Sequence, residues 1–324
     1  MTELVEMRPL EKAVTSNEIY ALSPSELECI LDVLNNVSAE YCVDHFEEFF
    51  WHCVRASQML PAAIHKRIFD LKKLQVNHLL LRNLPVSFDL GDTPLKRSGQ
   101  HQKSALTARK LMSVLLSQIG LIYGFTQKSN FDFIDDVFPV EKDKHEQLGT
   151  NKEFLEWHVE DGFHDAKADW VSLFCLRSDP MAQTYLFHAK DIDLDSKYMA
   201  ALKRPEYMIE VDKTFKSNGA SEQKVAVLSE HDDPEIVYDP AYMRCLTDEA
   251  KAAFRELHYF VSENKQSITL RCGDLLIFDN RRTIHARSEY EPRYDGTDRW
   301  LLRALLLESQ FKAREHFDSF LKVS

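Results

Sequence analysis

Apolar residues recur at helical spacing through most of the first part of the chain. Ser23 and Glu26 flank Pro24 as in a capping box with proline at the first helical position, which predicts a helix over residues 24–35. Similar spacing without a breaker predicts three further helices, and one apolar run predicts a strand. These helices would cover residues 39–57, 61–74 and 104–123, and the strand residues 76–81.

Short apolar runs of the length typical of strands dominate from residue 170 onward. One amphipathic helix, over residues 248–263, interrupts them. Many strands after a helical lead indicate an α+β protein whose core is a double-stranded β-helix, the jelly-roll or cupin-like fold, with a helical N-terminal buttress. The predicted strands cover residues 170–176, 184–187, 207–211, 224–228, 236–238, 267–270, 275–278, 283–285 and 299–307.

The 324 residues are 44% apolar, enough for one large core or two small ones. No stretch rich in proline, glycine and serine, no low-complexity run and no internal repeat divides the chain. We therefore expect a single domain over residues 1–324, with a helical lead over 1–75 and a jelly-roll core over 76–310.

Charge and cysteine usage narrow the class of protein. A net charge of −12 argues against nucleic-acid binding, which needs a basic surface. Residues 1–6 lack the basic and apolar regions of a signal peptide, and the longest apolar runs are too short for a membrane span. The six cysteines form no CxxC pair, so we expect a reduced cytoplasmic protein without a membrane partner. A homo-oligomer stays open.

Four histidines are followed two residues later by an acidic residue, a common pattern in an acidic chain. Side chains at i and i+2 share a face only in extended chain, because in a helix they diverge by about 200°. This excludes His45, which lies in a predicted helix. His231 lies in a loop, and His316 follows the last apolar strand. Only His158 leads through a short link into a predicted strand.

A second candidate histidine, His285, ends the predicted β segment 283–285. The turn signal Asp279-Asn280 precedes that segment. Downstream, Arg299 and Arg303 lie on one face of an otherwise apolar predicted strand. Burying two arginines is costly without anions, so they either pair with internal carboxylates or hold the carboxylates of ligands.

His158, Glu160 and His285 together supply two imidazoles and one carboxylate, the facial triad of non-haem Fe(II) oxygenases. The other face of such a metal stays open for a 2-oxo acid and O2. Arg299, fourteen residues after His285, can hold the far carboxylate of that acid. The pattern predicts oxidation by Fe(II), 2-oxoglutarate and O2. The alternative of another class is a non-catalytic, cupin-like metal-binding protein, which would need neither Arg299 nor Arg303.

Several motifs between about residues 124 and 307 resemble those of a known enzyme family. These segments are His158-Val-Glu-Asp-Gly-Phe-His164, Phe174-Cys-Leu-Arg-Ser-Asp-Pro180, Thr184-Tyr-Leu-Phe187, Asp232-Asp-Pro-Glu-Ile-Val-Tyr-Asp239, Gly273-Asp-Leu-Leu-Ile-Phe-Asp-Asn-Arg-Arg282, His285 and Pro292-Arg-Tyr-Asp-Gly-Thr-Asp-Arg-Trp300. On them, the chain resembles the clavaminate synthase-like branch of Fe(II)/2-oxoglutarate-dependent oxygenases, and within it the bacterial free L-lysine hydroxylases.

The resemblance implies roles for the metal and co-substrate residues. His158, Glu160 and His285 resemble the iron ligands of the family. Arg299 resembles the arginine that grips the far carboxylate of 2-oxoglutarate, and Thr184 its hydroxyl partner.

The resemblance also implies roles in binding the substrate. Gln127 resembles a glutamine on the substrate α-amino group, although it would equally fit as a neighbour of a helix C-cap. Arg303 resembles the arginine for the α-carboxylate. Asp239, Asp232 and Asp233 fall in a lid near residues 229–240 that meets the distal cationic group of the substrate. For Asp232 and Asp233 a solvated turn is the alternative.

The reaction expected from this resemblance is hydroxylation. Related halogenases have a small residue at the carboxylate position, whereas Glu160 fills it; desaturation stays open. The expected substrate is free L-lysine, oxidised at C4 rather than C3, giving hydroxylysine, succinate and CO2. The alternative is arginine or another amino acid handled by an enzyme of the same branch.

Overall fold

The N-terminal helices follow the predicted order in the computed structural model, which describes residues 18–86, 90–97, 105–128, 131–211, 222–311 and 313–323. The capping box is confirmed, since the Ser23 side chain accepts the N–H of Glu26 and the Glu26 carboxylate accepts the N–H of Ser23 at 2.8 Å. The first three helices are α1 (Pro24–Asn35), α2 (Phe46–Ser57) and α3 (Ala62–Lys72).

The second helix begins later than the predicted residue 39. It starts at Phe46, with His45 at its N-cap. Tyr41 is buried, and its hydroxyl donates to the carboxylate of Asp132 and accepts the N–H of Ile134 at 3.2 Å. These contacts bind the segment before Phe46 to a distant strand, which explains why the helix does not extend through it.

The stretch 104–123 divides into a helix and a strand, so the prediction of one helix was wrong. Helix α4 spans Leu106–Leu116 and strand β3 spans Leu121–Phe125; residue 104 lies outside the described part. Strand β3 pairs antiparallel with β14 (Trp300–Leu307), which satisfies its backbone groups. Gly120 makes the close approach, because a Cβ there would lie 2.4 Å from a carbonyl oxygen of β14.

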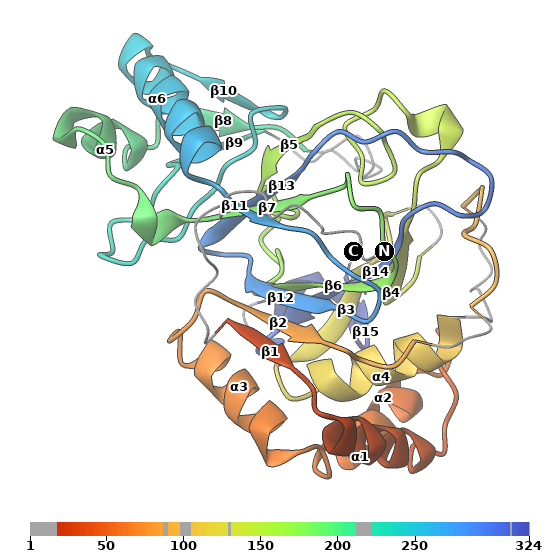
Figure 1. The fold of residues 1–324 in the computed structure, drawn as a ribbon. Coiled ribbons are helices and arrows are strands. Elements are labelled where there is room, and N and C mark those ends of the chain that lie inside the picture. The colour runs from red at the N-terminus through yellow and green to blue at the C-terminus, as the bar shows by residue number, and fades with distance from the viewer. Residues whose placement is uncertain are drawn as a thin grey trace, which may run out of the picture.

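The largest sheet in the described part has nine strands (Figure 1). Its order is β1-β2-β12-β6-β14-β3-β16-β15, and β4 also pairs with β14. The remaining strands of this sheet are β1 (Ile19–Ala21), β2 (His78–Arg82), β4 (Ile134–Val137), β6 (Trp170–Arg177), β12 (Leu275–Asp279), β15 (Phe317–Ser319) and β16 (Lys322–Val323).

Two smaller sheets complete the β structure of the described residues. The four-stranded sheet has the order β11-β7-β13-β5, and the three-stranded sheet the order β10-β8-β9. Helices α5 (Ser196–Leu202) and α6 (Asp248–Asn264) lie beside the three-stranded sheet (Figure 1). The strands are β5 (Leu155–His158), β7 (Thr184–His188), β8 (Tyr207–Ile209), β9 (Gln223–Val225), β10 (Met243–Cys245), β11 (Gln266–Ile268) and β13 (Thr283–Arg287).

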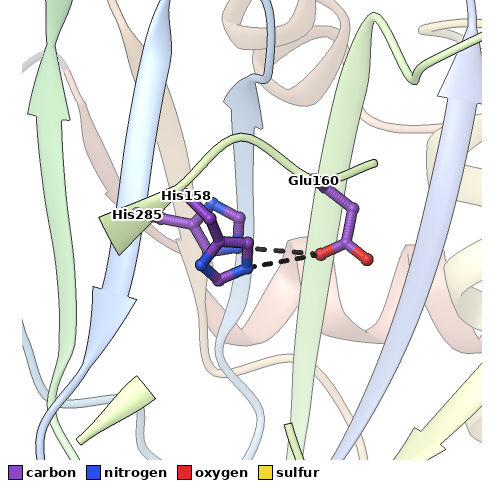
Figure 2. Close-up of side chains that lie close together, drawn as sticks. All are labelled: His158, Glu160 and His285. Carbon is purple, nitrogen blue, oxygen red and sulfur yellow. Dashed lines mark ion pairs between the residues drawn. The ribbon is translucent and has the colours of Figure 1, made fainter. Parts of the chain in front are cut away.

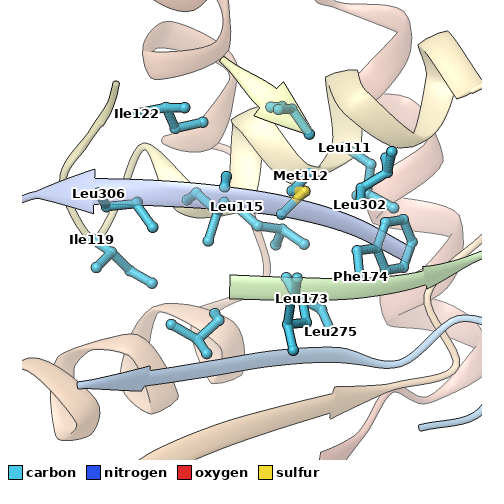
Figure 3. Packing of buried hydrophobic residues seen from close by; sticks show 14 of the residues in the cluster. Leu111, Met112, Leu115, Ile119, Ile122, Leu173, Phe174, Leu275, Leu302 and Leu306 are labelled. Carbon is cyan, nitrogen blue, oxygen red and sulfur yellow. The ribbon is translucent and has the colours of Figure 1, made fainter. Parts of the chain in front are cut away.

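The larger of two buried hydrophobic clusters lies between the N-terminal helices and the nine-stranded sheet, and the other includes buried residues of β7, β13, α5 and α6. On β14, Leu302 and Leu306 belong to the same buried cluster as Leu111 and Leu115 of α4 (Figure 3). A strand alternates its side chains, so residues such as Arg303 project from the other face, toward the four-stranded sheet. The result is a mixed α and β protein, consistent with the expected jelly-roll core and its helical buttress.

Most predicted strands are confirmed with shifted ends, but residues 236–238 form only an isolated bridge, between Leu228 and Ile236. The elements missed by the sequence pattern are β1, β4, β5, β10, β15, β16 and α5. Strands such as β5 carry polar residues toward a pocket and therefore lack the apolar alternation that marks a half-buried strand. Among the described residues, no helix is long and apolar enough to cross a membrane.

Candidate metal centre and substrate pocket

Two neighbouring strands bring His158 and His285 together. The residues are direct partners in the antiparallel pairing of β5 with β13, and their ring centroids lie 4.1 Å apart. Glu160 follows two residues after the end of β5. Its Oε2 lies 3.9 Å from Nε2 of His158 and 3.8 Å from Nε2 of His285, so all three side chains point to one spot (Figure 2).

The surroundings of the two imidazoles suit metal binding. Nδ1 of His158 donates to the carbonyl oxygen of Glu156 at 2.7 Å, which leaves the Nε2 lone pair directed at Glu160. Burial, together with the neighbouring His158, holds the pKa of His285 well below its ordinary value, so that imidazole is neutral. In the described part of the chain, this is the one group of three or more histidine, cysteine or acidic side chains whose ligand atoms converge, all within 4.8 Å.

Glu160 is ionised although it is buried. Burial alone would raise the pKa of this carboxyl group, but Arg303 and Lys128 lower it to about 2. Nη1 of Arg303 donates to Oε1 of Glu160 at 2.6 Å, and Nζ of Lys128 lies 3.8 Å from the same oxygen. The cations therefore occupy Oε1 and leave Oε2 toward the histidines. Two imidazoles and one carboxylate fit Fe(II).

The other three histidine-acid patterns do not form a comparable group. His45 is exposed at the N-cap of α2. His231 is exposed in a bend. His316 has its Nε2 3.9 Å from Asp165 and its ring beside His164. The predicted secondary structure around each histidine thus singled out His158 from these three. The helix predicted around His45 begins at the next residue, Phe46.

A pocket of about 230 Å³ opens beside the three candidate ligands. Strands of both the nine-stranded and the four-stranded sheet line it. Thr184 reaches it from β7, and Arg299, Leu301 and Arg303 reach it from β14 and the residue before it. The prediction that these last three side chains share one face is thus confirmed.

The two arginines differ in what they contact. Arg299 is 5% exposed, and its guanidinium has no hydrogen-bond or ion-pair partner within the described ranges. Arg303 lies between two carboxylates, with Nη1 on Glu160 and Nη2 2.9 Å from Asp135. The alternative of internal pairing therefore holds for Arg303, whereas Arg299 is a buried cation that an external anion would stabilise.

The residues predicted to contact the substrate fall into two groups. Asp239 lines the pocket. Gln127 is absent from the lining, and its buried Oε1 has no hydrogen-bond partner among the described residues. Asp232 and Asp233 are exposed, and Asp233 forms an ion pair with Arg282 outside the pocket. The structure therefore brings Asp239 to the site but leaves the other three outside it.

Sequence reasoning missed several polar residues of the pocket. Glu156, Lys128, Asp135 and Arg287 all contribute to its lining. Alternation along a strand would have identified Glu156, because it lies two residues before His158 and so shares its face. The same alternation would have identified Arg287, two residues after His285, whereas Lys128 and Asp135 come from segments whose pairing was not predicted.

Comparison with known proteins extends these observations. The sequence pattern of the taurine catabolism dioxygenase TauD, TfdA family matches residues 206–305. L-lysine 3-hydroxylase of Catenulispora acidiphila is 30% identical over 99% of this chain and 93% of its own length. Clavaminate synthase 2 of Streptomyces clavuligerus is 29% identical over 78% of this chain and 80% of its own.

Solved structures agree with the sequence relatives. Asparagine oxygenase in complex with Fe(II), 2S,3S-3-hydroxyasparagine and succinate is 26% identical, with a TM-score of 0.86 over 94% of this chain and 99% of that one. The relatives are amino-acid oxygenases that use Fe(II), 2-oxoglutarate and O2, which excludes the non-catalytic alternative for this chain. The chain therefore belongs to the TauD/TfdA family, among its clavaminate synthase-like Fe(II)/2-oxoglutarate-dependent amino-acid oxygenases.

Proposed function

We propose that this protein hydroxylates free L-lysine, converting lysine, 2-oxoglutarate and O2 to hydroxylysine, succinate and CO2. The observation that carries the choice of a cationic substrate is Glu156. It faces the same pocket as His158, and no cation pairs with it among the described residues. A relative that matches 99% of this chain is named a lysine 3-hydroxylase, which supports lysine over other cationic amino acids.

Arg299 and Thr184 would hold the far carboxylate of 2-oxoglutarate. Both are buried and line the pocket. A buried guanidinium without an anion is costly, and a carboxylate that accepts two parallel N–H bonds removes that cost. The hydroxyl of Thr184 can donate a further hydrogen bond. This pair would orient the co-substrate relative to the metal ligands.

Arg303 would bind the substrate α-carboxylate, and Gln127 the α-ammonium group. Arg303 lines the pocket while it contacts Glu160 and Asp135, so the substrate would join an existing charge network. Gln127 has a buried acceptor oxygen without a partner among the described residues. Because Gln127 is absent from the pocket lining, this contact would require its side chain to turn into the pocket, where the oxygen would accept an N–H of the substrate.

Glu156 and Asp239 would receive the side-chain ammonium group of lysine. Both line the pocket, Glu156 from β5 and Asp239 from the proposed lid over residues 229–240. Residues two apart in a strand are separated by about 7 Å. A lysine side chain is long enough to span this separation, so its ammonium group could reach Glu156 while its reacting carbon lies near His158. An ammonium group enclosed without an anion would carry a desolvation penalty.

A contact of Asp232 or Asp233 with the substrate would require the proposed lid to move. Both side chains are exposed, and Asp233 would first have to leave Arg282. Asp239 is therefore our first choice in this segment.

The chemistry divides between the metal and the protein. Bound Fe(II) would supply the chemistry that lets O2, with 2-oxoglutarate as co-substrate, oxidise an unreactive C–H bond. The residues of this chain hold the carboxylates and ammonium groups of the two substrates and fix the distance from the reacting carbon to the metal ligands. Glu160 occupies the position at which halogenases have a small residue, which favours hydroxylation.

The carbon that is oxidised is a separate proposal. The sequence resemblance led us to expect C4. A lysine hydroxylase that matches 99% of this chain is named for position 3, and the asparagine oxygenase structure holds a 3-hydroxylated product. A lysine hydroxylase named for position 4 matches 55% of the chain at 25% identity. The longer match favours C3, and we propose C3 as the first position to test, with C4 as the alternative.

We also propose that the nine-stranded and four-stranded sheets are the two halves of a double-stranded β-helix within a single domain over residues 1–324. The lining of one pocket by both sheets supports this architecture. The reduced cytoplasmic setting expected from the cysteine pattern is part of the same proposal.

One experiment tests the proposed substrate. The protein is incubated with Fe(II), ascorbate and 2-oxoglutarate, together with each of the twenty amino acids in turn. Succinate and hydroxylated product are measured by mass spectrometry. We expect lysine to give the largest succinate formation with a matching amount of hydroxylysine. If arginine were turned over faster than lysine, arginine would be the preferred substrate and the proposal of lysine would be wrong.

A further inference from the structure

Asn280 lies in the turn between β12 and β13 and contacts the backbone of the carboxylate ligand. Its side chain is fully buried. Its Oδ1 accepts the N–H of Glu160 at 2.9 Å, and its Nδ2 donates to the carbonyl oxygen of Glu160 at 3.0 Å. The second N–H of the amide donates to the carbonyl oxygen of Ala168 at 3.1 Å. One side chain thus satisfies three backbone groups.

The segment that carries Glu160 has no strand to hold it. Strand β5 ends at His158, and the next residue after Glu160, Asp161, has a left-handed φ of 49° in a tight turn. Backbone pairing that fixes His158 against His285 therefore stops before the carboxylate. The amide of Asn280 replaces that pairing, because it meets both the N–H and the C=O of one residue.

Asn280 is itself held firmly in place. The backbone N–H of Asn280 donates to the backbone carbonyl oxygen of Asp169 at 2.9 Å. The preceding residue, Asp279, pairs with Trp170 at the end of β12. His285 follows five residues later on β13. A rigid connection therefore runs from the backbone of Glu160 through Asn280 to the strand that presents His285.

We propose that Asn280 is a positioning residue for the metal centre. By fixing the backbone of Glu160 relative to the two histidines, it sets the metal affinity of the free protein, before 2-oxoglutarate or amino acid binds. Residues that orient metal ligands through hydrogen bonds alter affinity by roughly 10- to 100-fold when they are replaced.

Co(II) titration of the metal-free protein, without 2-oxoglutarate or amino acid, tests this role. Dissociation constants and the visible absorption of bound Co(II) are compared for wild type and Asn280→Ala. We expect the substitution to weaken Co(II) binding about 10- to 100-fold and to change the absorption spectrum. A metal affinity equal to that of wild type would overturn the proposal.

Asn151→Ala is the matched control. Asn151 is also a fully buried asparagine, and its amide also joins two segments, through Arg287 and the carbonyl oxygen of Glu146. None of these groups is a candidate metal ligand. We expect Asn151→Ala to destabilise the fold but to leave Co(II) affinity within about twofold of wild type, well short of the outer-shell effect. An equal loss of affinity in both variants would assign Asn280 a general structural role and overturn the proposal.

Asn280→Asp decides the question if Asn280→Ala does not fold. This variant keeps the oxygen that accepts the N–H of Glu160 but loses the donors to Glu160 and Ala168. We expect a folded protein with Co(II) affinity between those of wild type and a ligand variant such as His158→Ala. Wild-type affinity would contradict the positioning role.

Discussion

His158 and His285 are direct cross-strand partners, and both direct Nε2 at the same oxygen of Glu160. Partners in an antiparallel pair hold their side chains about 5 Å apart without any loop having to order them. Backbone pairing thus brings the two imidazoles together, and the hydrogen bond from Nδ1 of His158 to the carbonyl oxygen of Glu156 orients one of them. The carboxylate lies beyond the strand and depends on side chains, chiefly Asn280 and Arg303.

Removal of one imidazole should abolish turnover while the fold survives. His158→Ala leaves two ligand groups, and its loss of Fe(II) affinity should exceed the roughly 10- to 100-fold typical for loss of an outer partner. Metal titration, circular dichroism and succinate formation measure the three quantities. His231→Ala, at an exposed histidine in the same kind of pattern, should behave like wild type. Normal succinate formation by His158→Ala would refute the metal assignment.

Arg299→Ala should raise the KM for 2-oxoglutarate far more than the KM for lysine. A hydrogen bond to a charged group contributes about 1.5–3 kcal/mol, which corresponds to about a 10- to 100-fold change. Steady-state kinetics with each substrate varied in turn give both constants. Arg255→Ala, at an exposed arginine on α6, should change neither. Equal effects of Arg299→Ala on both substrates would show that this guanidinium does not select the co-substrate.

Acidic residues of the pocket should discriminate lysine from norleucine, which has a methyl group in place of the terminal aminomethyl group. Wild type should use norleucine at least about tenfold less efficiently, because the pocket then encloses an unpaired carboxylate. Glu156→Gln and Asp239→Asn should each narrow the gap in kcat/KM. Asp193→Asn, at an exposed position outside both the pocket and the proposed lid, is the matched control. If wild type uses norleucine as well as lysine, the pocket does not recognise the charge.

His188 should make the protein less stable in mild acid. Burial, with Arg282 and Lys190 nearby, lowers its pKa to about 3, whereas an unfolded histidine titrates near about 6.5. Between these values the unfolded state binds the proton more readily, so stability falls as pH decreases through this window and is fully present above it. The loss from pH 7 to 5 is about 2 kcal/mol. Urea unfolding of His188→Gln at pH 7 and pH 5 should show a fall in the free energy of unfolding that is smaller than that of wild type by this amount. An equal fall in both proteins would exclude His188 as the cause.

The parts of the fold that were predictable are those where local pattern and burial agree. Helix α1 begins and ends as expected because its capping box is local. The prediction of one helix over residues 104–123 was wrong because Leu121 and Ile122 continue the helical spacing of α4, whereas their backbone pairs with β14. That pairing joins residues far apart in the chain, and no local pattern contains it.

The candidate site shows the same limit. His158, Glu160 and His285 were predictable because the metal restricts which residue types can serve as ligands. Asn280 was read only as a turn residue, since its hydrogen bonds to Glu160 cross from one strand connection to another. Likewise, pairing of Asp233 with Arg282 depends on a contact between distant segments.

Turnover under isotopically labelled O2 tests the central claim most directly. The protein, loaded with Fe(II), is supplied with lysine and 2-oxoglutarate, and both products are analysed by mass spectrometry. Hydroxylation by this family's chemistry predicts one labelled oxygen atom in hydroxylysine and one in succinate, formed in equal amounts, with fragmentation placing the new hydroxyl at C3 or C4. Succinate without hydroxylysine, or hydroxylysine without the label, would contradict the proposal that this pocket oxidises lysine with O2.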